Sequence, residues 1–420
     1  MPPLEAGLSS RFQNRESSDV DANAMHDPGI PRREICPACG TKARPFFELP
    51  SVPTNSCVLM ESEEEALAYP RGDVVLGFCT GCGFVWNLAF DPRLTEYSGR
   101  YEETQGFSPT FREFHRKLAA ELLERHGLRD KDILEIGCGK GEFLALLCEL
   151  GQNRGIGFDP SYDEQREILD GIDNVRVVRD FYSDAYADLQ ADLVCCKMTL
   201  EHIPDTGEFA RLARRAMRPN PESVLYFLVP NAKRILNECA FEDIYYEHCS
   251  YFTAGSLARL FRSTGLRIHR LGTEYAGQYL AIEAGPADQA TELELAEECD
   301  LAELQSLVAS FSRRCEAKID SWRRRLRSAR SNGSVVLWGS GSKGVAFLGA
   351  VDRDRLVDRV VDINPHKQGH YMPSSGQEIV APASLRDDPP DTVIVMNAIY
   401  EQEIAAELAG MDIGAEVFSL

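Results

Sequence analysis

Apolar runs alternate with longer, helix-like stretches through the middle of the chain. Runs apolar enough for buried strands occur at Asp132–Ile136, Gly155–Phe158, Val175–Val178, Ala191–Cys196 and Val224–Val229. Strands separated by segments of helical length indicate a parallel sheet with crossover helices. We therefore predict an α/β domain over residues 93–286.

The pattern changes in the last third of the chain. Residues 287–332 contain no strand signal, and their apolar positions follow the helical period of 3.6 residues, at Leu301, Leu304, Leu307, Val308 and Phe311. We predict one helix, or two, linking two domains. Residues 333–420 return to strand-like runs and predict a second, smaller α/β domain, with strands at Ser334–Trp338, Asp358–Asp362, Thr392–Met396 and Ala415–Phe418.

The N-terminal residues differ in composition from both α/β blocks. Residues 1–32 are polar and rich in Ser, Asp, Asn and Pro, which predicts a disordered tail, and they lack the apolar core of a secretion signal. Residues 33–92 carry two closely spaced cysteine pairs and predict a small metal-binding domain. Because the chain has no apolar run of about 18 residues, the length of a membrane span, we expect a cytoplasmic protein without membrane contact.

The charge balance narrows the class of ligand. The chain has 45 Lys and Arg against 66 Asp and Glu, a formal net charge of −21 over 420 residues. Nucleic-acid binding depends on clustered basic side chains that neutralise phosphates, so we expect no nucleic-acid partner. A small-molecule acceptor is the better prediction, and the sequence leaves the oligomeric state open.

A glycine-rich turn follows the first strand of the larger α/β domain. The strand continues into Gly137, Gly139 and Gly141 before a helical pattern begins. Glycines allow a tight turn and a close approach to a ligand, and the following helix presents unpaired N–H groups there. Glu135 precedes the turn, and Asp159 ends the next strand, where its carboxylate can accept hydrogen bonds from both ribose hydroxyls of a nucleotide.

The same geometry suits two cofactors, NAD and S-adenosylmethionine (SAM). Dinucleotide-binding folds usually show the spacing G-x-G-x-x-G, whereas the turn here reads E-x-G-x-G-x-G. This form resembles class I SAM-dependent methyltransferases, so we favour SAM over an NAD-dependent dehydrogenase. The resemblance implies that Asp180 and Phe181 flank the adenine and that residues 192–204 line the methyl-transfer centre. Glu201 and His202 in that segment would equally suit the capping of a loop.

Four cysteines form two C-x-x-C-G motifs, in which the pairs are Cys36 with Cys39 and Cys79 with Cys82. Four thiolates suit tetrahedral Zn²⁺, and the glycine after each pair permits the tight turn around a metal. With four thiolates the ion has no open coordination position, so we predict a structural zinc site. An iron–sulfur cluster or a redox dithiol would use the same residues, and Cys57 is a less suitable ligand.

The order of these blocks, together with two short runs, resembles a known family. The runs are Tyr245-Tyr-Glu-His248-Cys-Ser-Tyr-Phe252 and Val361-Asp-Ile-Asn-Pro-His-Lys-Gln-Gly369. From residue 36 to residue 420 the chain resembles the sugar C-methyltransferases of deoxysugar pathways, which act on nucleotide-linked keto-hexoses. The resemblance implies an N-terminal zinc domain, a class I methyltransferase core with a Rossmann-like fold, and a C-terminal Rossmann-like α/β domain.

In that family a Tyr-x-Glu-His cluster lies at the active site, which implies catalytic roles for Tyr245, Glu247 and His248, with His248 as the base. Methylation of a carbon beside a carbonyl requires removal of a proton and stabilisation of an enolate. A histidine with a pKa near neutrality suits the first task. A tyrosine hydroxyl or the second histidine, His202, suits the other. Taken alone, His248 would better suit a structural role in the core or at a cap, and the polar residues crowded around it favour a catalytic role instead.

Two runs depart from the family pattern. Typical members carry Gly-Gly-Ser after the core and Leu-Pro-Trp-Asn near the end, whereas this chain has Ala276-Gly-Gln-Tyr279 and Val395-Met-Asn-Ala-Ile-Tyr400. The first hypothesis is therefore C-methylation of a nucleotide-linked keto-sugar, the second O- or N-methylation of another metabolite, and the third a module that binds SAM without turnover. The turn Gly339–Gly344 suits either a diphosphate beside Lys343 or no ligand.

Overall fold

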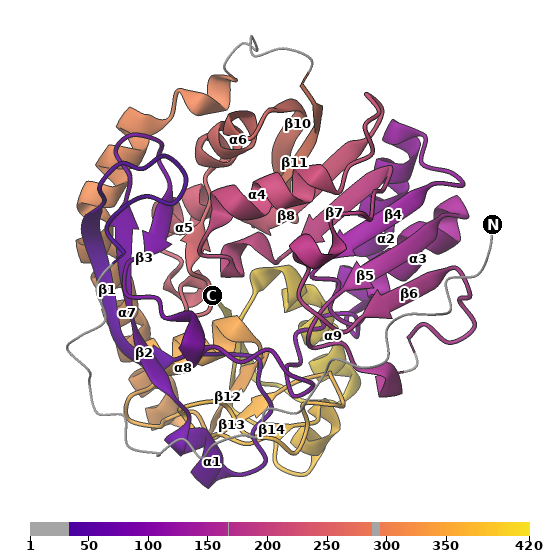
Figure 1. The fold of residues 1–420 in the computed structure, drawn as a ribbon. Coiled ribbons are helices and arrows are strands. Elements are labelled where there is room, and N and C mark those ends of the chain that lie inside the picture. Colours follow the sequence, from indigo (N-terminus) through magenta and orange to yellow (C-terminus); the bar gives the residue numbers. More distant parts are fainter. Residues whose placement is uncertain (1–32, 167, 288–294) are drawn as a thin grey trace, which may run out of the picture. The chain divides into compact units, whose positions relative to one another are not determined.

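The computed structural model of the chain describes residues 33–166, 168–287 and 295–420. The predicted N-terminal tail, residues 1–32, lies outside these ranges. Residues 32–420 form one compact unit, and its described part contains three β-sheets, of four, seven and five strands. Figure 1 shows the chain passing from indigo N-terminal strands through a magenta central sheet to yellow C-terminal elements.

The four-stranded sheet is antiparallel and holds the cysteine block. In sheet order its strands are β1 (Arg44–Pro53), β2 (Arg71–Phe78), β3 (Val85–Asn87) and β9 (Ser250–Tyr251), and helix α1 (Glu63–Ala68) lies between β1 and β2. Strand β9 comes from the larger α/β block, and Val85 pairs with Tyr251. A strand of two residues leaves no periodic signal in the sequence. The cysteine block is thus hydrogen-bonded to the segment that carries the predicted catalytic residues.

The seven-stranded sheet has the order β10-β11-β8-β7-β4-β5-β6. Its strands are β4 (Asp132–Ile136), β5 (Arg154–Phe158), β6 (Val175–Val178), β7 (Leu193–Lys197), β8 (Val224–Pro230), β10 (Leu266–Glu274) and β11 (Tyr279–Pro286). The first five follow the predicted strands and pair in parallel. The chain order reverses beside β4, and such switch points are the usual ligand sites of α/β sheets.

Two expectations for this sheet are wrong. Strand β11 is antiparallel to β8, and β10 is antiparallel to β11, so the sheet is mixed rather than parallel. In the described residues, the connections from β5 to β6 and from β6 to β7 contain 3₁₀ turns, η2 (Glu164–Arg166) and η3 (Asp184–Tyr186), in place of crossover helices. Hydrophobic patterning reports burial and not strand direction, and these short connections are rich in Asp and Ser, which favour turns.

Helices pack on both faces of the central sheet. They are α2 (Pro109–His126), α3 (Glu142–Gly151), α4 (Thr206–Arg215) and α6 (Ala254–Ser263), whereas α5 (Ala232–Glu238) joins the cluster that contains β1 and β2. Successive residues of β7 point to opposite faces, so Leu193 and Cys195 join the buried cluster of α2 and α3, whereas Val194 and Cys196 join that of α4 and α6. This two-sided burial explains why the strands read as continuous apolar runs.

Local signals set the ends of these helices. Helix α2 begins after Ser108, whose hydroxyl accepts a hydrogen bond from the Phe111 N–H, and Pro109 occupies its first turn. It ends at Gly127, which adopts the left-handed conformation with φ 58°. Helix α6 begins with a reciprocal cap between Thr253 and Ser256.

The predicted linker is one continuous helix, α7 (Leu301–Asn332). Its buried residues recur on one stripe, at Leu304, Phe311, Cys315, Ile319, Trp322, Leu326 and Ala329. The helix packs against β1, α5 and α8, and Figure 1 shows it in orange alongside β1. Among the described helices, none combines the length and the apolar character needed to cross a bilayer.

The five-stranded sheet is parallel throughout and holds the C-terminal block. In sheet order its strands are β14 (Ile379–Val380), β13 (Arg359–Val361), β12 (Val335–Trp338), β15 (Thr392–Val395) and β16 (Glu416–Ser419), with helices α8 (Ser342–Val351) and α9 (Glu401–Gly410). Four of these strands follow the predicted ones. The chain order reverses between β12 and β15, which creates a second switch point.

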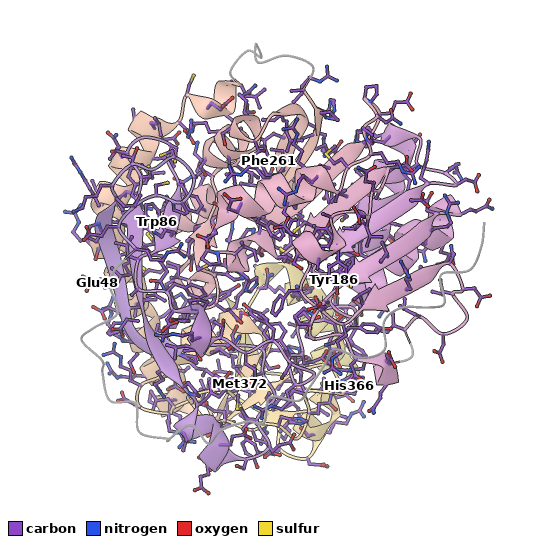
Figure 2. The ribbon with its side chains drawn as sticks, viewed as in Figure 1. Glu48, Trp86, Tyr186, Phe261, His366 and Met372 are labelled. Atoms are coloured by element: carbon purple, nitrogen blue, oxygen red, sulfur yellow. The ribbon has the colours of Figure 1, made fainter. Side chains whose placement is uncertain are left out.

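Shared buried clusters join the three sheets. One cluster contains Phe47 of β1, Phe241 of the central block and Phe347 of α8. A second contains Trp86 of β3 and Phe261 of α6, and Figure 2 labels both side chains. Burial of one such aromatic side chain contributes about 1.5–3 kcal/mol. The blocks predicted as separate domains therefore share their cores and form one unit.

Candidate functional site

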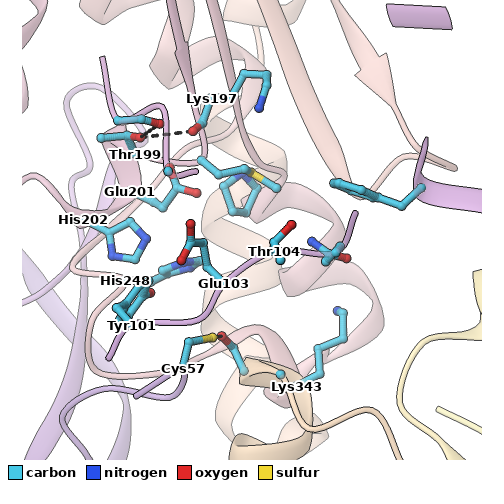
Figure 3. Close-up of a pocket in the computed structure, with 18 of the residues that line it drawn as sticks. Cys57, Tyr101, Glu103, Thr104, Lys197, Thr199, Glu201, His202, His248 and Lys343 are labelled. Atoms are coloured by element: carbon cyan, nitrogen blue, oxygen red, sulfur yellow. Dashed lines mark hydrogen bonds between the residues drawn. The ribbon is translucent and has the colours of Figure 1, made fainter. Parts of the chain in front are cut away.

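A cavity of about 880 Å³ lies at the carboxyl ends of the parallel strands. Its walls are the turn after β4, the ends of β5 and β7, residues 95–108 before α2, and the loops after β12 and β15. Both switch points therefore open into the same space. Figure 3 labels side chains around the cavity from residues 101–104, from the end of β7 and from the start of α8.

The turn after β4 requires glycine at its first position. Gly137 has φ 70°, and a Cβ there would lie 2.0 Å from Thr199 Oγ1. Gly139 has φ 55°, and its N–H donates to Asp159 Oδ2 at 2.8 Å. These are left-handed conformations that side chains disfavour. The turn thus keeps a backbone surface bare for a ligand.

Asp159 follows β5 and lines the cavity. Its Oδ2 accepts the Gly139 N–H, and its Oδ1 accepts the N–H and hydroxyl of Ser161 at 2.8 and 2.6 Å. A carboxylate offers about four lone-pair positions. One position on Oδ2 therefore stays available to a ribose hydroxyl, and a second becomes available when the Ser161 hydroxyl rotates away.

The other predicted cofactor residues divide into two groups. Asp180 and Phe181 line the cavity, and Phe181 is 59% exposed. Glu135 and Gly141 are not on the cavity wall. Glu135 is buried with its Oε1 3.8 Å from Lys197 Nζ, and burial raises the pKa of its carboxyl to about 7 against the effect of that lysine. Glu135 thus supports the turn from behind.

The cofactor end of the cavity is acidic. Glu103 lies beside the turn, 2.5 Å from the place a Cβ on Gly139 would take, and burial raises the pKa of its carboxyl to about 7. Asp159 and Glu142 line the same region. Carboxylates of this kind favour a ligand with positive charge, such as the sulfonium and ammonium groups of SAM. The bare glycine turn and the acidic lining together fit SAM.

Three of the four predicted catalytic residues meet at one point of the cavity. The rings of Tyr245 and His248 are 4.1 Å apart between centroids, and those of His202 and His248 are 4.7 Å apart. Tyr97 OH lies 2.9 Å from His202 Nδ1. Burial lowers the pKa of His202 to about 4 and that of His248 well below its usual range, so both imidazoles are neutral.

The fourth residue, Glu247, lies behind the wall. Its carboxylate accepts hydrogen bonds from Asn55 Nδ2 at 2.9 Å, from Tyr101 OH at 3.1 Å, and from the N–H and hydroxyl of Ser56. Four donors fill the acceptor positions of a carboxylate. Glu247 therefore anchors the segment that carries His248 to the cysteine block and to residues before α2.

Several side chains at the site escape sequence reasoning. The cavity wall also includes Tyr97, Tyr101 and Glu103, which belong to an irregular segment before α2, and Lys197 and Lys367. No motif or apolar period marks the first three. Lys197 lies in the segment 192–204 and Lys367 in the run 361–369, which the sequence analysis singled out without giving either lysine a role.

The turn after β12 repeats the hydrogen bonds of the turn after β4. The N–H of Gly339 donates to the Val361 carbonyl at 2.8 Å, as that of Gly137 does to the Phe158 carbonyl. Ser340 N–H donates to Asp362 Oδ2 at 2.9 Å, in the way that Gly139 binds Asp159. The two α/β blocks therefore share the backbone geometry of their glycine turns.

Two lysines line the cavity near the second turn. Lys343, in the first turn of α8, pairs with Asp243, which also binds Arg234. Lys367 is 6% exposed and lines the cavity, and no ion pair or side-chain hydrogen bond joins its ammonium group to another described residue. The backbone N–H groups at the start of α8 face the same space.

The two runs that depart from the family pattern contact each other. Gln278 and Asn397 exchange side-chain amide hydrogen bonds at 2.9 and 3.2 Å. Tyr275 OH donates to Tyr400 OH at 2.7 Å. Gln278, Asn397 and Tyr400 line the cavity. The two departures from the family pattern therefore contact each other and alter the same wall of the cavity.

The four cysteines of the N-terminal block form one cluster. Sγ atoms of Cys36, Cys39, Cys79 and Cys82 all lie within 4.8 Å of one another. The closest pairs are Cys39 with Cys79 at 3.4 Å and Cys36 with Cys82 at 3.6 Å. Four sulfurs around a tetrahedral zinc are about 3.8 Å apart, so the cluster fits such an ion. Cys57 lies elsewhere, on the cavity wall, with its sulfur 3.5 Å from Ser342 Oγ.

Two protein families match the chain. Residues 111–271 match the family described as a methyltransferase domain, and residues 281–418 match the family described as a C-methyltransferase C-terminal domain. The first range contains the turn after β4 and the cluster of His202 and His248. The second contains the turn after β12.

The chain is also similar to two curated proteins. It is 28% identical over 326 residues to the C-methyltransferase NovU of Streptomyces niveus, a match that covers 73% of this chain and 76% of that protein. It is 28% identical over 133 residues to the ubiquinone biosynthesis O-methyltransferase of Erwinia tasmaniensis, which covers 29% of this chain and 54% of that protein.

Solved structures resemble part of the chain. The 1,6-didemethyltoxoflavin-N1-methyltransferase of Burkholderia thailandensis, with bound 1,6-didemethyltoxoflavin and S-adenosylhomocysteine, has a TM-score of 0.34 and 19% identity, covering 43% of this chain and 82% of that one. A SAM-dependent methyltransferase from Aquifex aeolicus has a TM-score of 0.34 and 15% identity, covering 46% of this chain and 98% of that one.

Proposed function

Because this chain belongs to the SAM-dependent methyltransferases that join a methyltransferase domain to a C-methyltransferase C-terminal domain, we propose that it methylates a carbon beside the carbonyl of a nucleotide-linked keto-sugar. The matches to methyltransferase families favour this class over an NAD-dependent dehydrogenase and over a module without turnover. One observation carries the proposal: a single cavity joins the turn after β4, the histidine cluster and the turn after β12.

The first turn and its acidic surroundings are the proposed cofactor site. Gly137 and Gly139 would approach the cofactor through their backbone, and Asp159 would bind its ribose. When bound, SAM supplies a methyl group on a positively charged sulfur. The neighbouring carboxyls of Glu103 and Glu142 stabilise that charge, and the enclosed walls exclude water from the transfer.

The second turn supports an acceptor that carries a diphosphate. The start of α8 offers unpaired N–H groups, and Lys343 and Lys367 add two ammonium groups beside them. Phosphates bind such helix starts because the donors and the helix dipole both favour negative charge. Asp362 takes the place in this block that Asp159 takes in the other, so it would bind the ribose of a nucleotide. These features favour a nucleotide-linked acceptor over a neutral metabolite.

The histidine cluster is the proposed centre of proton removal. His248 is neutral, lines the cavity and has no hydrogen-bond partner among the described residues, so a ring nitrogen is available to accept the proton beside the carbonyl. Tyr245, whose hydroxyl keeps its proton because burial raises its pKa, and His202 would donate to the enolate oxygen. Glu247 holds the segment in place.

Solvent exchange tests this function. With a thymidine-diphosphate 4-keto-6-deoxyhexose as probe, we expect exchange of the proton beside the carbonyl in deuterium oxide, and its loss in His248→Asn. In the presence of SAM, nuclear magnetic resonance of the product should show a new methyl group on carbon. A methyl group on oxygen or nitrogen, without exchange, would instead support the second hypothesis, for which the similarity to an O-methyltransferase is the one specific observation.

We also propose that the four-cysteine cluster binds a structural zinc ion. Its sulfurs fit tetrahedral coordination, and four thiolates leave no position for a substrate. Metal analysis of the purified chain should give about one zinc per chain. Cys39→Ser should lose the metal and lower the unfolding temperature while the residual folded enzyme retains methyl transfer. Visible absorbance from iron would contradict the proposal.

A further inference from the structure

The proposed proton transfer places a positive charge where the protein disfavours one. His248 is buried, and burial lowers its pKa well below the usual range; His202 and Lys343 act in the same direction. A buried imidazole that accepts a proton needs a carboxylate nearby to stabilise the imidazolium. The adjacent Glu247 does not meet this need, because its four acceptor positions are filled by other donors.

The carboxyl group of Glu201 can provide the stabilising carboxylate. Glu201 lies in the 3₁₀ turn η4 (Leu200–His202) that follows β7, lines the cavity and is 1% exposed. Neither of its carboxyl oxygens has a hydrogen-bond partner among the described residues. Burial of a carboxyl without a hydrogen-bond partner costs folding free energy. Such a group in a native structure therefore points to a role in ligand binding or proton transfer.

Glu201 lies close to both histidines of the site. A carboxyl oxygen of Glu201, a ring nitrogen of His202 and a ring nitrogen of His248 all lie within 4.8 Å of one another. Figure 3 shows the three side chains converging from one wall of the cavity. Hydrogen bonds among catalytic groups are often long in a free enzyme and shorten when the substrate binds.

We infer that Glu201 is the positioning residue that stabilises protonated His248 during proton removal, an assignment that rests on the proposed function. The bond between the acceptor carbon and its hydrogen breaks, its electron pair stays on the acceptor as the enolate, and the proton moves to a ring nitrogen of His248. The Glu201 carboxylate then pairs with the imidazolium, directly or through His202. The site keeps the same net charge through the step.

Other charged and titratable groups surround Glu201. Burial raises the pKa of the Glu201 carboxyl to about 8, against the opposing effects of its own backbone N–H and of Lys197 of β7, so the carboxyl holds a proton near neutral pH. The remaining groups are neutral there; they are Cys196, Tyr97, His202, Tyr245, His248, Cys249 and Tyr279. A cation bound at the cofactor turn would ionise Glu201 and thereby prepare the base.

Exchange of the acceptor proton tests the assignment without methyl transfer. We expect Glu201→Gln to slow solvent exchange of the keto-sugar probe by at least about 30-fold, with little change in the KM of the probe, and Glu201→Asp to recover part of the rate. The matched control is Glu208→Gln on α4, which changes an exposed carboxylate that pairs with Arg211. This control should exchange at the wild-type rate.

The charge of the bound cofactor provides a second readout. At pH 7 the wild-type enzyme should exchange the probe faster with sinefungin, which carries an amine near the sulfonium position, than with neutral S-adenosylhomocysteine. This difference should disappear in Glu201→Gln. Infrared spectra of the wild-type enzyme should show protonated carboxyl absorbance that sinefungin reduces, and the share that belongs to Glu201 should be missing in Glu201→Gln, in which Glu103 and Glu135 remain.

The outcomes separate the inference from the function. Absence of exchange in the wild-type enzyme overturns the proposed function. Wild-type exchange that Glu201→Gln leaves unchanged overturns the role of Glu201 and leaves the function standing. A second bound metal ion per chain that Glu201→Gln removes would also overturn it, because the carboxyl would then be a metal ligand with His202 and His248.

Discussion

The two glycine turns share a backbone and differ in charge. Each follows a central parallel strand, each donates its first N–H to the carbonyl that ends the neighbouring strand, and each holds an aspartate at the tip of that strand. The turn after β4 lies among Glu103, Glu135 and Asp159. The turn after β12 lies beside Lys343 and Lys367.

This difference separates the features of a nucleotide site that the fold determines from those that the side chains determine. The strand, turn and helix determine where a ribose and the next group of a ligand can approach, because they position one aspartate and one row of N–H groups. The side chains around them determine whether that next group carries positive or negative charge. We propose that one fold accepts a sulfonium in one block and a diphosphate in the other.

The largest expected effect comes from adding a side chain to the backbone of the turn after β4. Gly137→Ala should weaken binding of S-adenosylhomocysteine at least about 100-fold, because the residue has φ 70° and its Cβ would lie 2.0 Å from Thr199 Oγ1. Calorimetry measures this. Gly341→Ala is the matched control, since Gly341 has φ −74° and no atom within 4 Å of an added Cβ. Equal binding by both variants would contradict the strained turn.

The next effect distinguishes the two aspartates. Asp159→Asn should weaken binding of S-adenosylhomocysteine by about 10- to 100-fold, since it removes a charged acceptor, and should leave binding of thymidine diphosphate unchanged. Asp362→Asn should do the reverse. Calorimetry of both ligands with both variants tests each aspartate against each ligand. If each variant weakened both ligands equally, the two turns would not be separate subsites.

A smaller expected effect tests the lysines beside the turn after β12. Lys367→Met should weaken binding of thymidine diphosphate by about tenfold, because no described side chain pairs with the buried ammonium group, and should leave S-adenosylhomocysteine binding unchanged. The affinity of the wild-type enzyme should also fall with added salt. Lys117→Met changes an exposed lysine on α2 and should alter neither ligand. No loss in Lys367→Met would remove the diphosphate from this subsite.

The smallest expected effect is a change of folding stability with pH, caused by three buried carboxyl groups near the cofactor site. The carboxyls of Glu103, Glu135 and Glu201 have pKa values raised to about 7, 7 and 8 from the ordinary 4.5, chiefly by burial. Above pH 6.5 the unfolded chain has released these protons and the folded chain has not, so stability should fall as pH rises to about 8. The buried histidines, whose pKa values are lowered, act only below that window.

Thermal unfolding between pH 6.5 and 8.5 checks this sign. The unfolding temperature of the free enzyme should fall by a few degrees across the window. Saturating SAM should flatten the curve, since a bound cation favours the carboxylates, and Glu201→Gln should flatten it in part. A temperature that rises with pH in the free enzyme would show that these carboxyls are ionised.

Local patterns predicted the strand cores and the first turn correctly, because both depend on neighbours in the chain. The apolar run before Gly137 and the positive φ of that glycine are consequences of a few adjacent residues. The antiparallel direction of β11, the joining of β9 to the cysteine sheet, and the loop of Tyr97 and Glu103 over the cofactor turn were not predicted. Each depends on contacts between distant segments, which leave no period in the sequence.

The sequence by itself determined which segments are strands and helices, where the bare glycine turn falls, and which four thiols are spaced for a metal. Only the tertiary structure decided the charge that each turn meets, and that Glu201 rather than Glu247 is the carboxyl without a partner. The physical reason is that burial and pairing control a carboxyl's protonation, and both are properties of side chains that meet from distant parts of the chain.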